Sequence, residues 1–190
     1  LFRSNGRHAD EARATVKRWD EEAYKKAVQS ANENAYAYYL QYYPEGQFRF
    51  EIAEKLRVLK EDNAFRAAVS STGPEGLRNF IKQYPNSRHT ESALDILNRM
   101  DNRAYNVALK GESLDAYNQY LKQFPDGQYA VEIEQLKKEK TYSFHIDKGN
   151  YYLEVKWPED AKNHFNAALS IKPGDPAARA GIKKAERMER

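Results

Sequence analysis

Residues 36–46 read Tyr36-x-x-Tyr39-Leu40-x-x-Tyr43-Pro44-x-Gly46, and the chain repeats this pattern twice. The second copy is Leu77-x-x-Phe80-Ile81-x-x-Tyr84-Pro85-x-Ser87 and the third is Tyr117-x-x-Tyr120-Leu121-x-x-Phe124-Pro125-x-Gly127. The three prolines lie 41 and 40 residues apart (85 − 44, 125 − 85). A fixed period of this length is typical of proteins built from stacked helical repeats.

The spacing inside each copy is helical. Positions 36, 39, 40 and 43 follow the i, i+3, i+4, i+7 rule and so share one face of a helix. Proline then ends the helix, and the glycine two residues later permits a tight turn. The stretches between copies are also helical, so each repeat is expected to contain a long helix of about 22–25 residues and a short one of about 11.

Start signals separate the long helices from the short ones. The stretch from Thr72 to Glu75 has the spacing of a capping box, with Pro74 at the first helical position. Gly111 precedes a short helix that is expected to start near Ser113. No stretch alternates cleanly between apolar and polar residues as a strand would. The fold class is therefore all-α.

The last quarter of the chain has a related pattern. Residues 142–175 fit a 34-residue helix–turn–helix unit. Its matching positions are Gly149, Tyr152, Ala161, Phe165, Ala168 and Pro173, whereas His145 and Lys148 depart from the pattern. Residues 177–189 are rich in charge and suit a helix that caps the end of the array.

With these motifs the chain resembles the tetratricopeptide-like superfamily, and its 40-residue copies resemble a variant common in bacterial envelope proteins. The resemblance implies a right-handed α-solenoid of antiparallel helix pairs. It divides the chain into long/short repeats at 1–140, a tetratricopeptide unit at 141–175 and a capping helix at 176–190. It favours the bacterial cell envelope or periplasm, with the cytoplasm as the alternative.

The beginning of the chain resembles the end of a further copy. Gly6 lies 40 residues before Gly46, and Phe2 stands where Tyr42 would. We therefore expect the sequence to begin inside a repeat, with part of another repeat before it in the full protein. An apolar face left open there would allow two copies to associate.

Composition narrows the function further. There are 31 basic and 28 acidic residues, and the basic clusters at 137–140 and 183–184 are mixed with acid, which disfavours nucleic-acid binding. With no cysteine, thiolate metal sites and cysteine nucleophiles are excluded. The mean hydropathy is −0.94, and no apolar stretch approaches the roughly 20 residues that span a bilayer.

The residues that carry chemistry form no catalytic pattern. His8 and His89 occupy equivalent repeat positions where Phe48 and Tyr129 stand in the other copies, which indicates aromatic-like packing. His145 stands at a packing position of the tetratricopeptide pattern. No nucleophile elbow, phosphate-binding loop or H-E-x-x-H motif is present. We therefore expect no enzyme activity, no catalytic residue, no cofactor and no metal.

Two tyrosines do not recur between the copies. Tyr38 aligns with Asn79 and Gln119, and Tyr42 aligns with Gln83 and Gln123. Tyrosine is enriched where proteins bind each other. Tyr38 and Tyr42 are therefore either a partner-binding patch, or packing residues that lie under an upstream repeat or against Phe48 or Phe50.

These patterns predict a non-catalytic scaffold that binds a peptide or helix of a partner protein on the concave face of the solenoid. The candidate contact residues are Tyr38, Tyr42, Ile146, Asn150 and Leu153. The resemblance places Ser143 and Asp147 where a carboxylate-binding clamp would need lysine and asparagine, so a basic or apolar peptide is favoured. The alternative is a structural spacer or oligomerisation segment that positions other domains.

Overall fold

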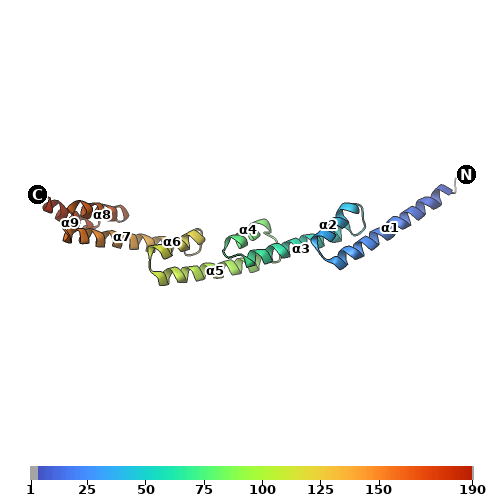
Figure 1. Cartoon of the computed structure of the whole chain (residues 1–190), viewed down its shortest axis with the longest axis horizontal. Coiled ribbons are helices and arrows are strands. Elements are labelled where there is room, and N and C mark those ends of the chain that lie inside the picture. Colours follow the sequence, from blue (N-terminus) through green and yellow to red (C-terminus); the bar gives the residue numbers. More distant parts are fainter. Residues whose placement is uncertain (1–3, 190) are drawn as a thin grey trace. The chain divides into compact units, whose positions relative to one another are not determined.

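The computed structural model describes residues 4–189, which form nine helices and no strand. In chain order the helices are α1 (Ser4–Ser30), α2 (Glu33–Tyr42), α3 (Arg49–Ser70), α4 (Glu75–Gln83), α5 (Thr90–Gly111), α6 (Leu114–Gln123), α7 (Ala130–Glu154), α8 (Pro158–Ile171) and α9 (Pro176–Met188). Long and short helices alternate as the repeat predicts (Figure 1). The long helices α3, α5 and α7 have 22, 22 and 25 residues, and the short helices α2, α4 and α6 have 10, 9 and 10.

The chain divides into two compact units. In the first, Leu1–Leu94, α2 packs against both α1 and α3, and α4 packs against α3. In the second, Asp95–Arg190, α6 packs against α7, and α7, α8 and α9 pack against one another. Each short helix therefore covers part of a long helix and buries the apolar stripe that the sequence repeats.

Side chains cap two of the short helices. Asn32 and Ser113 each accept a hydrogen bond from the backbone N–H three residues later, which satisfies one of the free donors at a helix start. The predicted capping box before α4 is wrong. Pro74 precedes the first helical residue, and no side chain caps this helix. The Ser71 hydroxyl donates instead to the Ala68 carbonyl at the end of α3.

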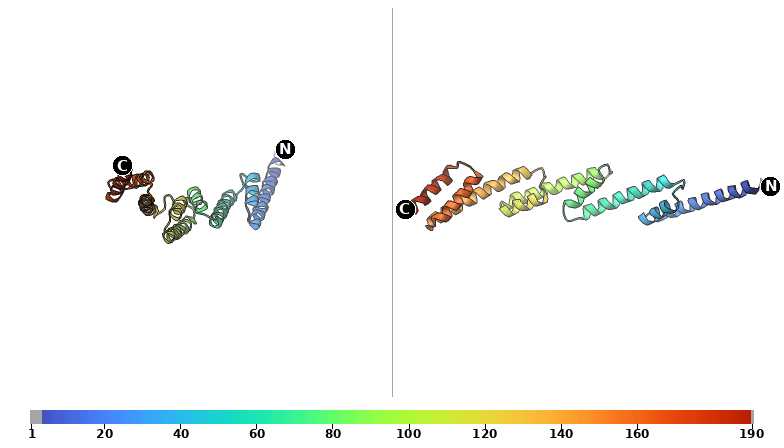
Figure 2. Two further views of the ribbon diagram at one scale, coloured as in Figure 1. Left: turned by 60° about the vertical axis from the view of Figure 1, so that its left-hand side comes forward. Right: turned by 90° about the horizontal axis from the view of Figure 1, so that it is seen from above.

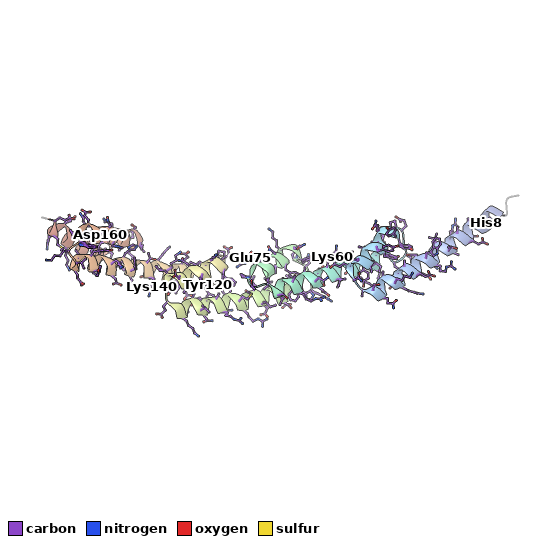
Figure 3. All side chains as sticks on the ribbon, viewed as in Figure 1. His8, Lys60, Glu75, Tyr120, Lys140 and Asp160 are labelled. Carbon is purple, nitrogen blue, oxygen red and sulfur yellow. The ribbon has the colours of Figure 1, made fainter. Side chains whose placement is uncertain are left out.

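Helix α1 differs from the expected end of a further copy. Gly6 lies inside the helix rather than in a turn like that at Pro44. Phe2 lies outside the described residues. His8 projects from the surface of α1, where its ring lies 3.4 Å from the Glu11 carboxylate, so the aromatic-like packing expected for it is wrong (Figure 3). His89 does pack as expected: its ring stacks on Phe65 at 4.5 Å between centroids.

A buried carboxylate joins the long and short helices in the first and third repeats. The Tyr39 hydroxyl donates to one oxygen of Asp20, and the Gln47 N–H donates to the other at 2.8 Å. In the third repeat the Tyr120 hydroxyl and the Gln128 N–H bond Asp101 in the same way, at 2.6 and 2.8 Å. The aspartate thereby ties the start of the next turn to the preceding long helix.

The charge and burial of this network act on the tyrosines. Burial, and then the hydrogen bond to the aspartate, raises the pKa of Tyr39 and Tyr120 far above the ordinary value of 10.0. Both hydroxyls therefore stay protonated and remain donors at neutral pH. Among the described residues, no buried side-chain nitrogen or oxygen lacks a hydrogen-bond partner.

The glycine of the repeat serves this network rather than a strained turn. The only glycine with positive φ in the described residues is Gly174. A Cβ on Gly127 would instead lie 2.5 Å from the Tyr120 hydroxyl and 2.9 Å from the Asp101 carboxylate. Gly46 has the same relation to Tyr39 and Asp20. The sequence-based explanation by turn conformation is thus corrected to one by close approach.

The middle repeat changes all three positions together. Glu61, Phe80 and Ser87 stand where the other copies have aspartate, tyrosine and glycine. Phe80 has no hydroxyl, so the space that the glycine leaves is not needed. A different polar link joins this turn to its long helix: Asp62 accepts hydrogen bonds from Arg88 at 2.6 Å and pairs with the His89 ring at 2.7 Å. These two partners, His89 foremost, lower the pKa of Asp62.

We predict that Gly127→Ala destabilises the second unit by about 1–3 kcal/mol, because the added methyl must displace the tyrosine hydroxyl or the carboxylate. Gly73→Ala is the matched control, since nothing lies within 4 Å of a Cβ built there. Urea unfolding followed by circular dichroism measures both. Equal unfolding midpoints for the two variants would refute this explanation of the repeated glycine.

The C-terminal part is built around one phenylalanine. Helix α7 runs unbroken across residues 140 and 141, so the long helix that follows the third repeat is also the first of the last three helices. Figure 2 shows α8 and α9 beside the end of α7 in both views. Phe165 of α8 is buried between Gly149 of α7 and Gly181 of α9, which lie so close that a Cβ on either would clash with its ring.

Candidate protein-binding groove

The largest exposed apolar side chains of the first repeat gather where α1 meets α2. Val16 and Trp19 of α1 are 57% and 54% exposed, and Tyr38 and Tyr42 of α2 are 58% and 59% exposed. Two hollows lie beside them and share Tyr43 in their linings. One is about 550 Å³ and includes Val16 and Tyr42, and the other is about 480 Å³ and includes Trp19 and Tyr38. We call the two hollows together the α1–α2 groove.

Tyr38 and Tyr42 interact with each other and not with the phenylalanines considered from the sequence. Their ring centroids are 4.4 Å apart. Phe48 stacks on Tyr24 instead, at 4.0 Å, and Phe50 is 80% exposed with the Arg49 guanidinium over its ring. The alternative of local packing on Phe48 or Phe50 is therefore wrong. The two tyrosines form an exposed aromatic pair at the groove.

The third repeat has an equivalent groove with a different lining. The hollow between α5 and α6 is about 240 Å³, half the volume of its counterpart. Met100 and Gln119 line it where the α1–α2 groove has Trp19 and Tyr38. The two repeats have corresponding helices and corresponding core residues, but they differ in these two side chains. The aromatic side chains at these two positions are thus particular to the first repeat and are not required by the fold.

The exposed side of α1 departs from its counterpart in α3 in the same direction. Val16 and Trp19 align with Arg57 and Lys60, both of which are exposed and charged. Conversely, the positions of α3 that contribute Ile52, Leu56 and Leu59 to the core are Glu11, Thr15 and Arg18 in α1. In α3 the apolar residues therefore lie on the face that packs against a short helix, whereas in α1 they lie on the face that borders the groove.

The charges around the groove are of both signs. Arg13, Lys17 and Glu45 border the hollow at Val16, and Glu22 and Lys26 border the one at Trp19. Asp20 also lines the groove, but its two oxygens are engaged by Tyr39 and Gln47. The hollow at Val16 is lined mainly by apolar atoms, and the hollow at Trp19 by polar and apolar atoms in about equal measure. Apolar surface with a polar rim is the usual anatomy of a protein-binding surface.

The other candidate contact residues lie in the second unit. Ile146 and Leu153 are half-buried and pack against the cluster around Phe165. Asn150 is exposed on α7. The core contacts of Ile146 and Leu153 explain why both positions are apolar. Only Asn150 of these three presents its side chain freely to solvent.

Two features of the structure are not among the candidate residues predicted from the sequence. Trp19 was missed, although its alignment with Lys60 marks it as an exception in the same way as Tyr38. The histidines His145 and His164 meet at 2.9 Å between their Nδ1 atoms. They are 19 residues apart in sequence, the same separation as Asp20 and Tyr39. A search for polar residues at this interval would have found both pairs.

Within residues 4–189 no group of three or more histidine and carboxylate side chains is arranged to hold a metal ion. No helix of that part combines the length and the apolar character needed to cross a membrane. Comparison with protein-family models and with curated proteins finds no match to the chain.

Proposed function

We propose that the chain is a non-catalytic protein–protein interaction module that belongs to the tetratricopeptide-like superfamily and binds a peptide or helix of a partner protein. The observation that carries this proposal is that the exposed rings of Trp19 and Tyr38 line the α1–α2 groove, where Met100 and Gln119 line the equivalent groove of the third repeat. An arrangement of the repeats as a right-handed solenoid would place such grooves along one extended surface.

The energetic argument concerns the exposed aromatic rings. Trp19, Tyr38 and Tyr42 are each more than half exposed. The aligned residues are Lys60, Asn79 and Gln83 in the second repeat and Met100, Gln119 and Gln123 in the third. Covering this surface is favourable by about 25 cal/mol per Å². Tryptophan and tyrosine also dominate binding hot spots, because each adds a large rigid area at little entropic cost. A partner segment with aliphatic or aromatic anchors fits these hollows best.

We predict that the double variant Trp19→Ala/Tyr38→Ala binds its partner at least about 30-fold more weakly, since two hot-spot residues are lost. The experiment is affinity capture from the source organism with the whole chain, followed by direct titration of the captured partner's segment. In a Trp157→Phe background Trp19 is the only tryptophan, so its fluorescence reports occupation of the groove in the parent. Calorimetry measures binding by the variant, which lacks Trp19.

The equivalent groove supplies the control. Met100→Ala/Gln119→Ala makes the corresponding change in the third repeat and should weaken binding by less than about 3-fold. Circular dichroism verifies that both double variants fold. Equal binding by the parent and the Trp19/Tyr38 variant would exclude the α1–α2 groove as the site. Failure to capture any specific partner would favour the spacer function.

A further inference from the structure

Helices α7 and α8 hold two histidine rings head to head. The Nδ1 atoms of His145 and His164 are 2.9 Å apart, and the ring centroids are 5.2 Å apart. Half of the difference is about 1.15 Å, the radius of an imidazole ring, so both nitrogens lie on the line between the ring centres. This is the alignment of an N–H···N hydrogen bond, in which one Nδ1 donates and the other accepts.

The alignment distinguishes a shared proton from a shared metal ion. Two histidines that bind one metal direct their lone pairs at a point off the line between them, with an angle of about 90–110° at the metal. Here the lone-pair directions oppose each other along one line. The geometry therefore fits a pair that shares one proton.

The surroundings of the pair are mostly aromatic. The Tyr152 ring stacks on His164 at 5.3 Å between centroids, and the Phe144 ring lies steeply inclined to both histidine rings, with its centroid 5.4 and 6.1 Å from theirs. Both histidines are half-buried. No carboxylate forms an ion pair with either ring among the described residues. A second positive charge in the pair would therefore have no nearby counter-charge.

The charged groups of all four helices at this corner are engaged elsewhere or exposed. Lys148 of α7 lies over the Phe144 and Tyr151 rings, and Asp160 precedes His164 by one turn on the exposed side of α8.

Charged groups from the neighbouring helices lie near the pair as well. Asp115 of α6 borders a hollow together with Phe144, Lys140 and Asp147 of α7. Tyr142, one turn before His145, interacts with Lys172 and Asp175. Helix α9 contacts α8 through Ala178, Gly181 and Ala185, and its charged residues 179, 183, 184, 186 and 187 are exposed.

We propose that the His145–His164 pair makes the packing of α7 on α8 sensitive to pH. In the uncharged pair one Nδ1–H donates to the other Nδ1 and joins the two helices. The first proton taken up in acid can enter the outer Nε2 of the donating ring and keeps this hydrogen bond. A second proton converts the accepting Nδ1 into a donor, which removes the hydrogen bond and leaves both rings positively charged. The helices then separate at this corner, and the packing around Phe165 loosens with them.

The direction of the pH dependence follows from proton linkage. Burial, and then the charge of His164, lowers the pKa of His145 below its ordinary value of 6.5. In mild acid the unfolded chain consequently binds more protons than the folded chain. The stabilisation is complete above about pH 6.5, decreases as the pH falls below that value and is gone below the pKa of folded His145.

We predict that nuclear magnetic resonance titration of the whole chain shows two separated protonation steps for this pair, with the second at clearly lower pH. In His164→Gln, the titration midpoint of His145 should rise toward the ordinary value. A midpoint of His145 that is unchanged by His164→Gln would overturn the proposal.

Thermal unfolding tests the consequence for stability. Glutamine at both positions keeps the capacity for a hydrogen bond but carries no charge. Between pH 7.5 and 5.5 the melting temperature of the parent should fall by about 2–4 °C more than that of His145→Gln/His164→Gln. An equal fall in both proteins would show that the pair does not sense pH. If the double variant does not fold, His145→Gln alone serves for the same comparison.

Discussion

Phe165→Ala is expected to lower the free energy of unfolding of the second unit by about 3–5 kcal/mol. The ring is 1% exposed and fills the space between Gly149 and Gly181. No other side chain can occupy that space, because both facing positions are glycine and have no atoms to move inward. Removal of the ring therefore leaves a cavity bordered by helix backbone on two sides, as well as losing the burial of the ring itself.

The measurement is urea unfolding in a Trp19→Phe background, where the fluorescence of Trp157 reports the second unit alone. Phe50→Ala makes the same chemical change at an 80% exposed position of the first unit and should cost less than about 0.5 kcal/mol. The explanation fails if circular dichroism shows the two variants to be destabilised equally.

The helices could be predicted from the sequence because their signal is local. Tyr36, Tyr39, Leu40 and Tyr43 mark one helical face, and Pro44 ends it within eight residues. Such patterns need no knowledge of what packs against the face. The same argument applied to the last quarter identified Gly149, Ala161 and Phe165, which the structure places at the contacts of α7 and α8.

The carboxylate network could not be predicted because its signal is not local. Asp20 lies beside Glu21 and Glu22 in the sequence, and nothing in its neighbourhood distinguishes it from these solvated carboxylates. Its partners are 19 and 27 residues away, across a helix boundary and a turn. Comparison of the copies holds the missing information, since aspartate, tyrosine and glycine change together in the middle repeat.

Comparison between the copies also explains why part of the candidate groove could be predicted from the sequence. Tyr38 and Tyr42 can be recognised as candidate contact residues because they differ from the aligned residues of the other copies in an otherwise regular helix. Trp19 differs from Lys60 just as clearly, but the long helices have a weaker repeat pattern, which makes this departure harder to recognise. Comparison between copies separates the residues that a repeat needs for folding from those that a single copy adds.

Asp101→Ala is expected to destabilise the second unit by about 3 kcal/mol. Asp101 is 5% exposed and accepts from the Tyr120 hydroxyl and the Gln128 N–H, so its removal leaves two donors without an acceptor. Tyr120 stays protonated because its pKa is raised, and it therefore cannot relieve the loss by ionising. Urea unfolding in the Trp19→Phe background measures the change.

Three further variants separate the network from the charge alone. Asp126→Ala removes an exposed carboxylate from the adjacent turn and should cost less than about 0.5 kcal/mol. Tyr120→Phe copies the middle repeat and should cost about 1 kcal/mol, because Asp101 keeps its bond to Gln128. Asp101→Ala/Tyr120→Phe should then cost less than the sum of its single changes, since the hydroxyl that lacks an acceptor is gone. Strict additivity of the two changes would mean that Asp101 acts on the fold without its bond to Tyr120.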